Sequence, residues 1–484
     1  MKNAKQSSMP SDDNSNLSRR DFLMASAVTA GGVFLPSMMQ AAAESSPGAQ
    51  LTSARAEPWA PHPRAAPKTE QRSLAFAIDA NGTRTCTGGW QWRYEGIVPE
   101  RGYEISTDVV YNGVAVPRDA LNCIAIWGSP KPTQNSSGAI WEYLLPSTSG
   151  PERLRFSRQL VAPPGATHLT VRATLRWTAA GKTVWQIPRV VATAPAPKLE
   201  PVRISVVTGG NAERRRRQFK TAQDNISFFG EHCEAACRQD HPALIVLPEV
   251  ALQWGVRGHA LDVAVPAPGP ETEAFSSIAR RHRTRIALGM YERDGDAVYN
   301  SLILIGTSGA IEGRYRKVHL AQGEDLSGVL PGDTFPVFST DVGRIGCNIC
   351  MDSMAPESAR LAALNGADFL LLPIMGDFRA DRWDMGPPVF NEDRWRAIMR
   401  TQALDNQFSL VVARNRAEGS CIINRKGDFL AWNNGEQAFI TADVPREDDF
   451  RSWNGSCFRD SAWQVRRPHL YNAFTDTAAQ GGSI

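Results

Sequence analysis

The stretch GRIGCNICMDSMAPESARLAALNGADFLLLP, residues 343–373, joins an apolar run to a helical run and then to a second apolar run. Near-continuous apolar runs connected by a helix are typical of strands that are buried on both faces of a sheet. The first run ends in two thiols three positions apart, Cys347 and Cys350. The stretch therefore predicts a buried strand–helix–strand unit with a cysteine where its first strand ends.

This CxxC pair has three available interpretations: a redox pair, half of a metal site, or a nucleophile beside a bystander thiol. In a strand, positions 347 and 350 point to opposite faces, which suits neither a redox pair nor shared metal ligation. A redox CxxC opens a helix instead. The nearest other cysteine pair, Cys233 and Cys237, falls inside a predicted helix, away from zinc spacing. The pattern favours a nucleophile with a bystander.

The same alternation of apolar strands and helices extends outward from this stretch over residues 202–446 and predicts an α/β domain. A break in all periodicity at 193–201 marks its start. One long helix is expected from Asn211 to about Arg238, and the basic run Arg214–Arg217 near its start is expected to form a solvated face. Further helices are expected at 271–283, 356–365 and 391–406.

Reactive side chains follow three of the predicted strands. Glu249 comes after ALIVLP, Lys317 after GRYR and Cys350 after GRIGCNI. Ligands of such sheets bind beyond the carboxyl ends of the strands. An acid, a base and a thiol at equivalent strand ends are improbable as three unrelated surface or core residues, so they predict a catalytic site.

The strings around these residues resemble the nitrilase, or carbon–nitrogen hydrolase, superfamily. LIVLPEVAL (244–252) resembles its glutamate motif, GRYRKVHL (313–320) its lysine motif and residues 343–373 its cysteine motif. Supporting matches are VYNSLILI, ALDNQFSLVVARN and INRKGDFLA. The resemblance implies an αββα four-layer sandwich, frequent homo-oligomers and a catalytic triad. Aligned by motif, that triad is Glu249, Lys317 and Cys350, with a second glutamate at Glu324 and Cys347 as the bystander.

The chemistry implied by the resemblance is consistent with the residue types. A free thiol has a pKa near ~8.5, which a pocket without charge would raise, so Cys350 needs a base, and Glu249 is the candidate. The Lys317 ammonium and the backbone N–H of Met351 would stabilise the oxyanion. Glu324 would hold Lys317 and the substrate nitrogen in place. The scheme requires no metal and no cofactor.

The residues after the nucleophile bear on the substrate. Family members that act on nitriles usually have Cys-Trp-Glu, whereas amidases and carbamoyl-amide hydrolases more often have Cys-x-Asp. Here the sequence is Cys350-Met351-Asp352, which favours amides. The family also contains membrane-bound N-acyltransferases, but this chain has no predicted transmembrane bundle, so hydrolysis is preferred.

Residues 1–43 predict an export signal. Arg19 and Arg20, followed by Phe22 and Leu23, resemble the twin-arginine pattern, and an apolar stretch and the cleavage pattern at 41–43 follow. The apolar stretch is short of the ~20 residues that a membrane span needs. The sequence thus predicts a periplasmic or secreted protein that is exported already folded, with no membrane anchor in its mature form.

Residues 44–70, rich in Ala, Pro and Ser, are expected to form a flexible linker. Short strands separated by turn residues over 71–192 predict an all-β sandwich, with a weak resemblance to jelly-roll modules. In this module Cys86 and Cys123 are candidates for a disulfide. Residues 447–484 are expected to form a tail that packs on the body or on a neighbour.

Trp90, Trp92 and Tyr94 alternate and so share one face of a strand in this module. Exposed, that face would be a stacking platform for carbohydrate; buried, it would be core, which is the preferred interpretation. Three functions remain open. They are an exported hydrolase of small amides, a glycan-docked hydrolase of a cell-wall or glycoconjugate amide, and a non-catalytic binding protein, which the intact set of four residues disfavours.

The overall charge argues against one class of partner. The net charge is only +3 over 484 residues, and 42% of the residues are apolar, enough for sizeable cores. So small an excess of positive charge predicts neither nucleic-acid binding nor binding to a membrane surface. The expected partners are a small-molecule substrate and further copies of the chain.

Overall fold

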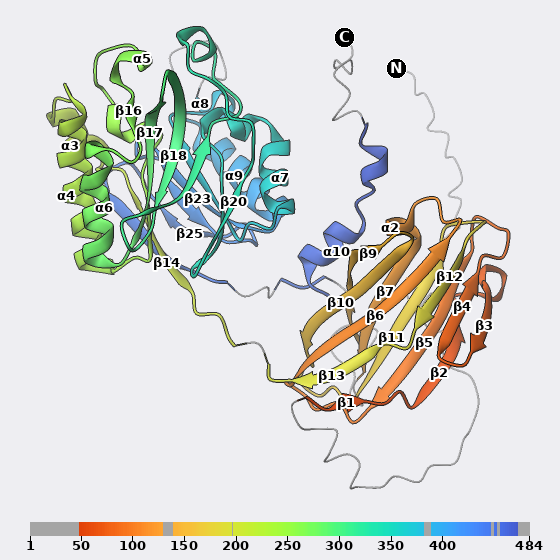
Figure 1. Ribbon diagram of the computed structural model, residues 1–484. Helices are drawn as coiled ribbons and strands as arrows, with labels where there is room; N and C mark the ends of the chain where they lie inside the picture. Colours follow the sequence, from red (N-terminus) through yellow and green to blue (C-terminus); the bar gives the residue numbers. More distant parts are fainter. Residues whose placement is uncertain are drawn as a thin grey trace, which may run out of the picture. The chain divides into compact units, whose positions relative to one another are not determined.

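The computed structural model describes residues 48–128, 139–195, 197–381, 389–446, 450–452 and 455–472. The predicted signal peptide lies outside these residues. The chain divides into two compact units, one comprising residues up to Pro197 together with those from Asp449 onward, the other Lys198–Asp448 (Figure 1). The division before the second unit falls within 193–201, where the apolar periodicity stops.

The first unit contains two antiparallel sheets around one hydrophobic core. One sheet has the order β1-β13-β6-β12-β4-β3, with β10 and β9 continuing from β6, and the other has the order β2-β5-β11-β7-β8. The elements are β1 (Gln50–Leu51), β2 (Arg55–Trp59), η2 (Pro63–Ala65), β3 (Lys68–Arg72), β4 (Ala75–Asp79), β5 (Thr87–Glu95), β6 (Gly102–Asn112), α2 (Pro117–Ala120), β7 (Leu121–Gly128), β8 (Ala139–Tyr143), β9 (Leu145–Gly150), β10 (Arg153–Val161), β11 (His168–Arg176), β12 (Lys182–Gln186) and β13 (Arg189–Thr193).

The alternating aromatic residues of β5 lie in this core. Trp90 is 5% exposed, and Trp92 and Tyr94 are completely buried. The rings of Trp90 and Trp92 both pack edge-on against Phe76 of the opposite sheet. The core interpretation of these residues therefore holds, and they offer no platform for a sugar.

The two cysteines of this unit are also buried, and their thiols are free. Cys123 lies on β7 within the core, where burial raises the pKa of its thiol. Burial likewise raises the pKa of Cys86, which precedes β5. The suggested Cys86–Cys123 disulfide is not present.

The prediction of a flexible linker at 44–70 is wrong for its described part. β2 pairs with β5, β1 pairs with β13, and β3, which begins at Lys68, pairs with β4. Each of these three strands lies at the end of a sheet's strand order. Edge strands are held by backbone hydrogen bonds while most of their side chains stay exposed, so they carry no apolar periodicity that a sequence could reveal.

The C-terminal segment belongs to the first unit. It contains helix α10 (Phe458–Gln464) and the 3₁₀ turn η6 (Pro468–Leu470). Buried Glu142 on β8 forms an ion pair with Arg451 at 2.6 Å, and Arg158 on β10 pairs with Asp460 of α10. Ion pairs from exposed Arg451 and half-buried Arg158 thus hold the expected tail on the sandwich sheets.

The second unit is of the α/β class, as predicted. Its two sheets have the orders β19-β18-β17-β15-β14-β26, with β16 beside β17, and β20-β21-β22-β23-β24-β25. The elements are β14 (Val202–Val207), α3 (Asn211–Arg216), α4 (Ala222–Asp240), β15 (Leu244–Val246), η3 (Ala251–Gln253), α5 (Ala260–Val263), β16 (Val265–Pro266), α6 (Pro270–His282), β17 (Arg285–Asp294), β18 (Ala297–Ile305), β19 (Ile311–Arg316), η4 (Asp325–Ser327), β20 (Val337–Thr340), β21 (Gly343–Cys347), η5 (Cys350–Met354), α7 (Pro356–Leu364), β22 (Phe369–Ile374), α8 (Phe378–Asp381), α9 (Glu392–Asn406), β23 (Ser409–Arg414), β24 (Cys421–Ile423), β25 (Phe429–Trp432) and β26 (Phe439–Val444).

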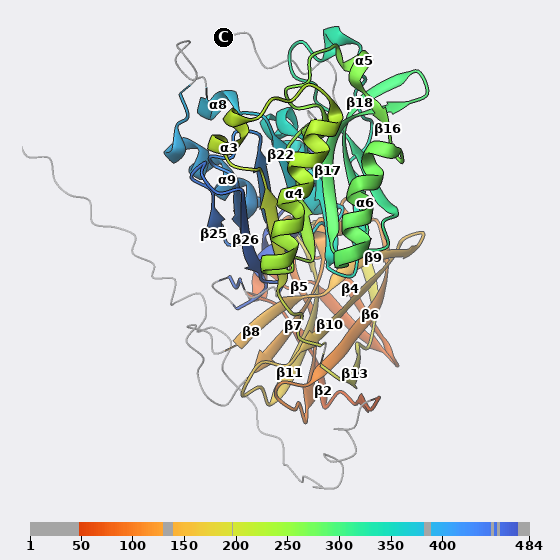
Figure 2. The same ribbon diagram turned by 90° about the vertical axis from the view of Figure 1, so that its left-hand side faces the viewer.

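The two sheets of this unit pack face to face through a shared core that contains residues of β14, β15, β17 and β18 together with residues of β21, β22, β23 and β24. A second core lies between the first sheet and helices α4 and α6, which run side by side in Figure 2. Helices α7 and α9 contact each other and strands of the second sheet. The central strands are parallel and covered on both faces, which explains their continuous apolar sequence.

The single helix expected from Asn211 to Arg238 is two helices, α3 and α4, separated at 217–221. The Asp224 carboxylate accepts the N–H groups of Lys220 and Thr221 at 2.9 Å each and so starts a new helix at this point. Arg214 is 7% exposed, and its guanidinium lies 4.9 Å from the centre of the Trp254 ring. The solvated face predicted for the basic run is therefore wrong at Arg214.

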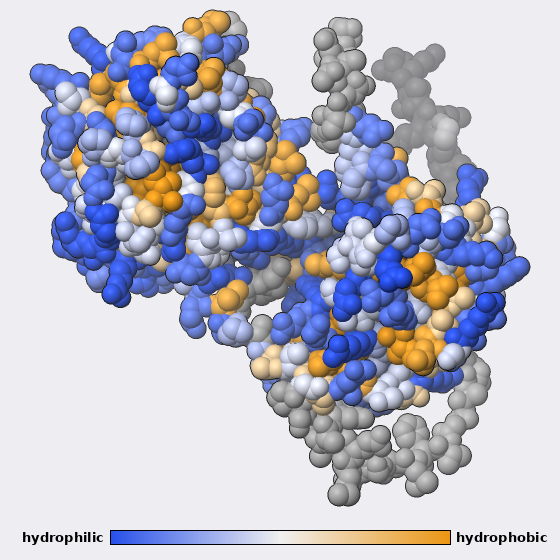
Figure 3. All heavy atoms as spheres, viewed as in Figure 1, coloured by the Kyte–Doolittle hydropathy of each residue, from blue (hydrophilic) through white to orange (hydrophobic). Residues whose placement is uncertain are grey.

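The visible surface of each unit is mostly hydrophilic, with apolar residues in separate patches (Figure 3). Exposed large apolar side chains include Leu74 and Trp177 in the first unit and Leu326 in the second. Within the described ranges, none of the helices combines the length and apolar character that a membrane crossing requires.

Candidate active site

Three predicted side chains follow strand ends of the second unit. Glu249 comes three residues after β15, Lys317 directly follows β19, and Cys350 opens η5 three residues after β21. β15 and β21 belong to different sheets, so the face-to-face packing brings the acid and the thiol to the same end of the shared core. The loop before Glu249 passes close over β17, where a Cβ on Gly289 would lie 2.2 Å from the carbonyl oxygen of Pro248.

Lys317 lies between two carboxylates. Its Nζ donates to Glu249 Oε1 at 3.0 Å and to Glu324 Oε2 at 2.6 Å, and its side chain is 1% exposed. Burial lowers the pKa of Lys317, but the negative charges around it, with Glu249 first among them, outweigh burial and raise the pKa above its ordinary value. The buried ammonium therefore stays charged at neutral pH.

Asn300 on β18 bridges the same two carboxylates. Its Nδ2 donates to Glu249 Oε1 and to Glu324 Oε1, at 2.8 Å each, and the residue is 1% exposed. Both N–H groups of one amide are thus used to hold two like charges in fixed positions. Hydrogen bonds to charged groups are among the stronger ones in proteins, each worth about 1.5–3 kcal/mol.

The loop after β22 contributes two backbone groups. The N–H of Met375 donates to Glu249 Oε2 at 2.8 Å, and the Cys350 thiol donates to the carbonyl oxygen of Gly376 at 3.6 Å. Burial raises the pKa of Cys350, the charge of Glu249 raises it further, and Lys317 opposes both. Because the net shift is upward, the thiol is protonated at neutral pH.

The turn that contains Cys350 is strained. Cys350 has φ 45° and Val250, which follows Glu249, has φ 43°. Residues other than glycine rarely adopt this left-handed region, and a β-branched valine is still less common there. Such strain persists only where the surrounding structure imposes it and is often found at active sites.

Asp352 fixes the turn that carries Cys350. Its completely buried carboxylate accepts the N–H of Ile349 at 2.8 Å, the hydroxyl of Tyr315 at 2.6 Å and the N–H of His319 at 2.9 Å. The ring of His319 also contacts Asp352 at 2.8 Å, and this hydrogen bond raises the pKa of His319. The turn is therefore anchored to the segment that follows Lys317.

A model of the family described as carbon-nitrogen hydrolase matches residues 215–453. The chain is 34% identical over 227 residues to N-carbamoylputrescine amidase of Solanum lycopersicum, a match that covers 43% of this chain and 74% of that protein. The chain belongs to the carbon–nitrogen hydrolase family.

This carbon–nitrogen hydrolase is also similar to two further relatives and to one solved structure. It is 29% identical over 217 residues to citrullinase of Francisella tularensis, covering 42% of this chain and 74% of that one. It is 33% identical over 175 residues to a probable nitrilase of Schizosaccharomyces pombe, covering 35% of this chain but only 60% of the relative. A crystal structure of a carbon-nitrogen hydrolase from Helicobacter pylori is 21% identical, with a TM-score of 0.45, and covers 57% of this chain and 99% of that one.

The hydrolase brings the predicted site residues together. Glu249, Lys317 and Glu324 are in direct contact, and the charges of Glu249 and Lys317 both act on the Cys350 thiol. Met351 follows Cys350 in η5 and is half-buried. Cys347 ends β21 and is 2% exposed in the shared core, where burial raises the pKa of its thiol. Among the described residues, no group of three or more His, Cys, Asp or Glu is arranged to hold a metal ion.

Three groups that shape this site were not predicted. They are the side chain of Asn300, the backbone N–H of Met375 and the ring of Tyr291, whose pKa is raised to about 12 by burial and by the charges of Glu324 and Glu249. The sequence offers a signal only for Asn300, a polar residue at the start of the apolar run NSLILI. A backbone donor carries no residue-type signal at all.

Replacing Asn300 with Ala should lower kcat by about 10- to 100-fold, because a hydrogen bond to a charged group is worth about 1.5–3 kcal/mol and both glutamates lose their shared donor. The measurement is turnover of the best amide substrate. Ser301→Ala is the matched control, since the Ser301 hydroxyl donates to Glu292 at 2.6 Å instead. If Asn300→Ala and Ser301→Ala lost equal activity, Asn300 would have no specific role in the active site.

Proposed function

We propose that this carbon–nitrogen hydrolase cleaves a small non-peptide amide or carbamoyl amide through a thioester on Cys350. The observation that carries the proposal is the buried Lys317 ammonium between Glu249 and Glu324, at 3.0 and 2.6 Å, beside a protonated thiol on a strained turn. Relatives named as amidase and citrullinase support amide hydrolysis.

Acylation begins when the Cys350 sulfur attacks the carbonyl carbon of the amide. As the C–S bond forms, Glu249 accepts the thiol proton and the carbonyl π electrons move to oxygen. The Lys317 ammonium and the N–H of Met351 stabilise this oxyanion, each such donor being worth roughly 3–4 kcal/mol. Because the ammonium is already buried and held by two carboxylates, little reorganisation is needed at that moment.

Three proton transfers by Glu249 complete the cycle. Glu249 gives its proton to the leaving nitrogen as the C–N bond breaks, which leaves the acyl group as a thioester on Cys350. It then takes a proton from the water that attacks the thioester, and it gives this proton to the sulfur as the C–S bond breaks and the acid departs. Glu249 is fit for this shuttle because Lys317, Asn300 and the N–H of Met375 fix both of its oxygens.

Glu324 serves as a positioning residue in this proposal. Its Oε2 accepts from Lys317 and from the N–H of Ala321 at 2.8 Å, and its Oε1 accepts from Asn300. Of the two carboxylates, Glu249 is the one whose charge acts on the Cys350 thiol. Glu324 holds the ammonium in place and keeps it charged, and it does not transfer protons.

The test of the proposed function is ammonia release from matched panels of amides, carbamoyl amides and nitriles. Turnover of amides or carbamoyl amides, and loss of that turnover after iodoacetamide treatment, is the expected result. The Cys350-Met351-Asp352 sequence favours amides over nitriles. Turnover of nitriles alone would replace the proposal with a nitrilase, and no turnover of any panel would favour a non-catalytic binding protein.

We further propose that the protein is exported folded by the twin-arginine route to the periplasm or beyond, and that it works there as a homo-oligomer. Changing Arg19 and Arg20 together to Lys should leave uncleaved precursor in the cytoplasm, because this route reads the paired arginines. Cell fractionation followed by detection with an antibody measures how much precursor stays in the cytoplasm. Changing the exposed pair Arg215 and Arg216 to Lys is the control. Undiminished export of the Arg19/Arg20 variant would exclude the route.

A further inference from the structure

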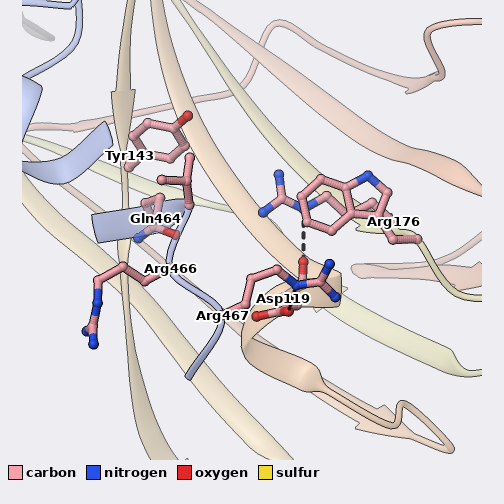
Figure 4. A pocket seen from close by; sticks show the side chains of 8 residues that line it. Asp119, Tyr143, Arg176, Gln464, Arg466 and Arg467 are labelled. Atoms are coloured by element: carbon pink, nitrogen blue, oxygen red, sulfur yellow. Dashed lines mark hydrogen bonds and ion pairs between the residues drawn. The ribbon is translucent and has the colours of Figure 1, made fainter. Parts of the chain in front are cut away.

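A pocket of about 360 Å³ lies in the first unit, where the segment after α10 covers the end of β11. Figure 4 shows its labelled side chains around a hollow, with Tyr143 and Gln464 on one side and Arg176 on the other. Its lining residues belong to the first unit, whereas the described residues of the candidate active site belong to the second. The lining residues are Asp119, Tyr143, Arg176, Trp177 and Gln464–Arg467.

The lining carries more positive than negative charge, with three arginines against one aspartate. Asp119 is already paired, since its Oδ2 accepts from Arg467 Nε at 2.8 Å and lies 3.5 Å from His469 Nδ1. Arg466 points away from Arg176 in Figure 4, and its guanidinium lies 5.6 Å from the centre of the Tyr471 ring. The unneutralised charge that faces the hollow is therefore that of Arg176.

Arg176 is anchored at one nitrogen and open at the other two. Its Nε donates to the backbone oxygen of Asp119 at 2.9 Å, while its terminal nitrogens make no hydrogen bond to another described residue. Figure 4 shows the guanidinium turned toward Tyr143 and Gln464. A half-buried guanidinium fixed in this way presents two parallel donors, which is the arrangement that binds a carboxylate or phosphate.

Trp177 provides the second surface. It is 56% exposed, and the Arg176 guanidinium lies 4.0 Å from the centre of its ring. Its φ of 59° is in the left-handed region, and its N–H donates to the carbonyl oxygen of Cys86 at 2.8 Å. An exposed indole held in a strained backbone, unlike the buried aromatic residues of β5, is an observation that points to a binding role.

We propose that this pocket binds an acidic sugar ring. The acidic group, carboxylate or phosphate, pairs with the free edge of Arg176, and one face of the ring packs on Trp177. The Tyr143 hydroxyl and the Gln464 amide, across the hollow from Arg176, are donors and acceptors suited to ring hydroxyls. They favour a hydroxylated ring over an aromatic acid, and the volume is at the low end of small-ligand pockets.

Calorimetric titration of the full-length protein tests this. Glucuronate and glucose 6-phosphate should each bind at least about tenfold more tightly than glucose, which has the same ring without the charge, because an arginine–anion pair is a strong, charge-assisted contact. A carboxylate and a phosphate are both included because Arg176 accepts either. Equal binding of glucose, or no binding of either acid, would overturn the proposal.

Variants assign the site. Arg176→Gln and Trp177→Ala should each weaken binding of the acids about tenfold or more, and Tyr143→Phe, which removes only a hydroxyl, should weaken it less. Arg153→Gln, an exposed arginine on β10 of the same unit, is the charge-matched control and should bind as wild type. If both Arg176→Gln and Trp177→Ala bound the acids with wild-type affinity, the acids would bind elsewhere on the protein and the proposal would be wrong.

Two further measurements separate the alternatives. Phenyl phosphate that binds as tightly as glucose 6-phosphate would show an anion site without sugar recognition, which contradicts the proposal. Iodoacetamide should label Cys350 at the same rate in all these variants, since every substituted residue belongs to the first unit. The proposal that the pocket binds an acidic sugar is therefore tested independently of the proposed amide hydrolysis.

Discussion

Cys350→Ala should have no measurable amide hydrolysis, a loss of at least about 10⁴-fold, because every step of the proposed reaction passes through its sulfur. Iodoacetamide should inactivate the wild-type protein with one label per catalytic site, on the peptide that contains Cys350. The raised pKa of the buried thiol predicts that labelling speeds up as the pH rises. Peptide mass spectrometry identifies the labelled residue.

Cys347→Ser is the matched control for this result. The Cys347 thiol is 2% exposed in the core between the two sheets, so the serine hydroxyl should cost on the order of 1 kcal/mol of stability. Turnover per folded molecule should be close to wild type. Preferential labelling of Cys347, or turnover by Cys350→Ala, would exclude Cys350 as the nucleophile.

Glu249→Gln should lower amide turnover by about 10⁴-fold or more, at or beyond the upper end of what general acid–base catalysis contributes. One residue serves both half-reactions, so both lose their proton carrier. The glutamine also replaces one accepting oxygen with an NH2 group, so either Lys317 and Asn300 or the N–H of Met375 lose the acceptor that the carboxylate gave them. Steady-state kinetics with the best amide gives the size of the loss.

An activated ester separates the acid role of Glu249 from its other roles. The alkoxide of such an ester leaves with little protonation, so acylation of Glu249→Gln by the ester should survive about tenfold better than acylation by the amide. Mass spectrometry should then show a thioester adduct on Cys350 that hydrolyses slowly, since deacylation still lacks its base. Equal losses on ester and amide with no trapped adduct would contradict the shuttle role.

Glu324→Gln is the control for charge. It keeps the shape of the side chain but removes one of the two charges beside Lys317, so a smaller loss is expected, shared by ester and amide alike. If Glu324→Gln lost more amide turnover than Glu249→Gln, and lost less with the ester than with the amide, Glu324 would be the proton shuttle instead.

The parts of the site that lie at strand ends could be predicted from the sequence. Glu249 and Cys350 each follow an apolar run and Lys317 follows a strand, and ligands of such sheets bind beyond the carboxyl ends of the strands, so a common site follows from the pattern. Asn300 was missed because it lies within a strand, where a polar residue has no fixed meaning until its facing partners are known. The N–H of Met375 could not be found, because any residue at that position supplies one.

The errors in the fold have a common physical origin. The strands in 50–72 are edge strands held by backbone hydrogen bonds, which leave no hydrophobic pattern. The break between α3 and α4 depends on one capping carboxylate, Asp224, inside a pattern that stays helical on both sides. Arg214 looked solvated because its aromatic neighbours, Trp254 among them, are distant in the sequence or on another helix.

The return of the C-terminal segment to the first unit sets an order on folding during synthesis. The buried carboxylate of Glu142 depends on Arg451 as well as Arg158, and burial raises its pKa against both arginines. Arg451 leaves the ribosome only after the whole second unit has been made. Glu142 therefore lacks one of its two arginine partners until synthesis is nearly complete, at a stage when all strands of the second unit have already been made. The first unit is the first to be synthesised and the last to complete its native contacts.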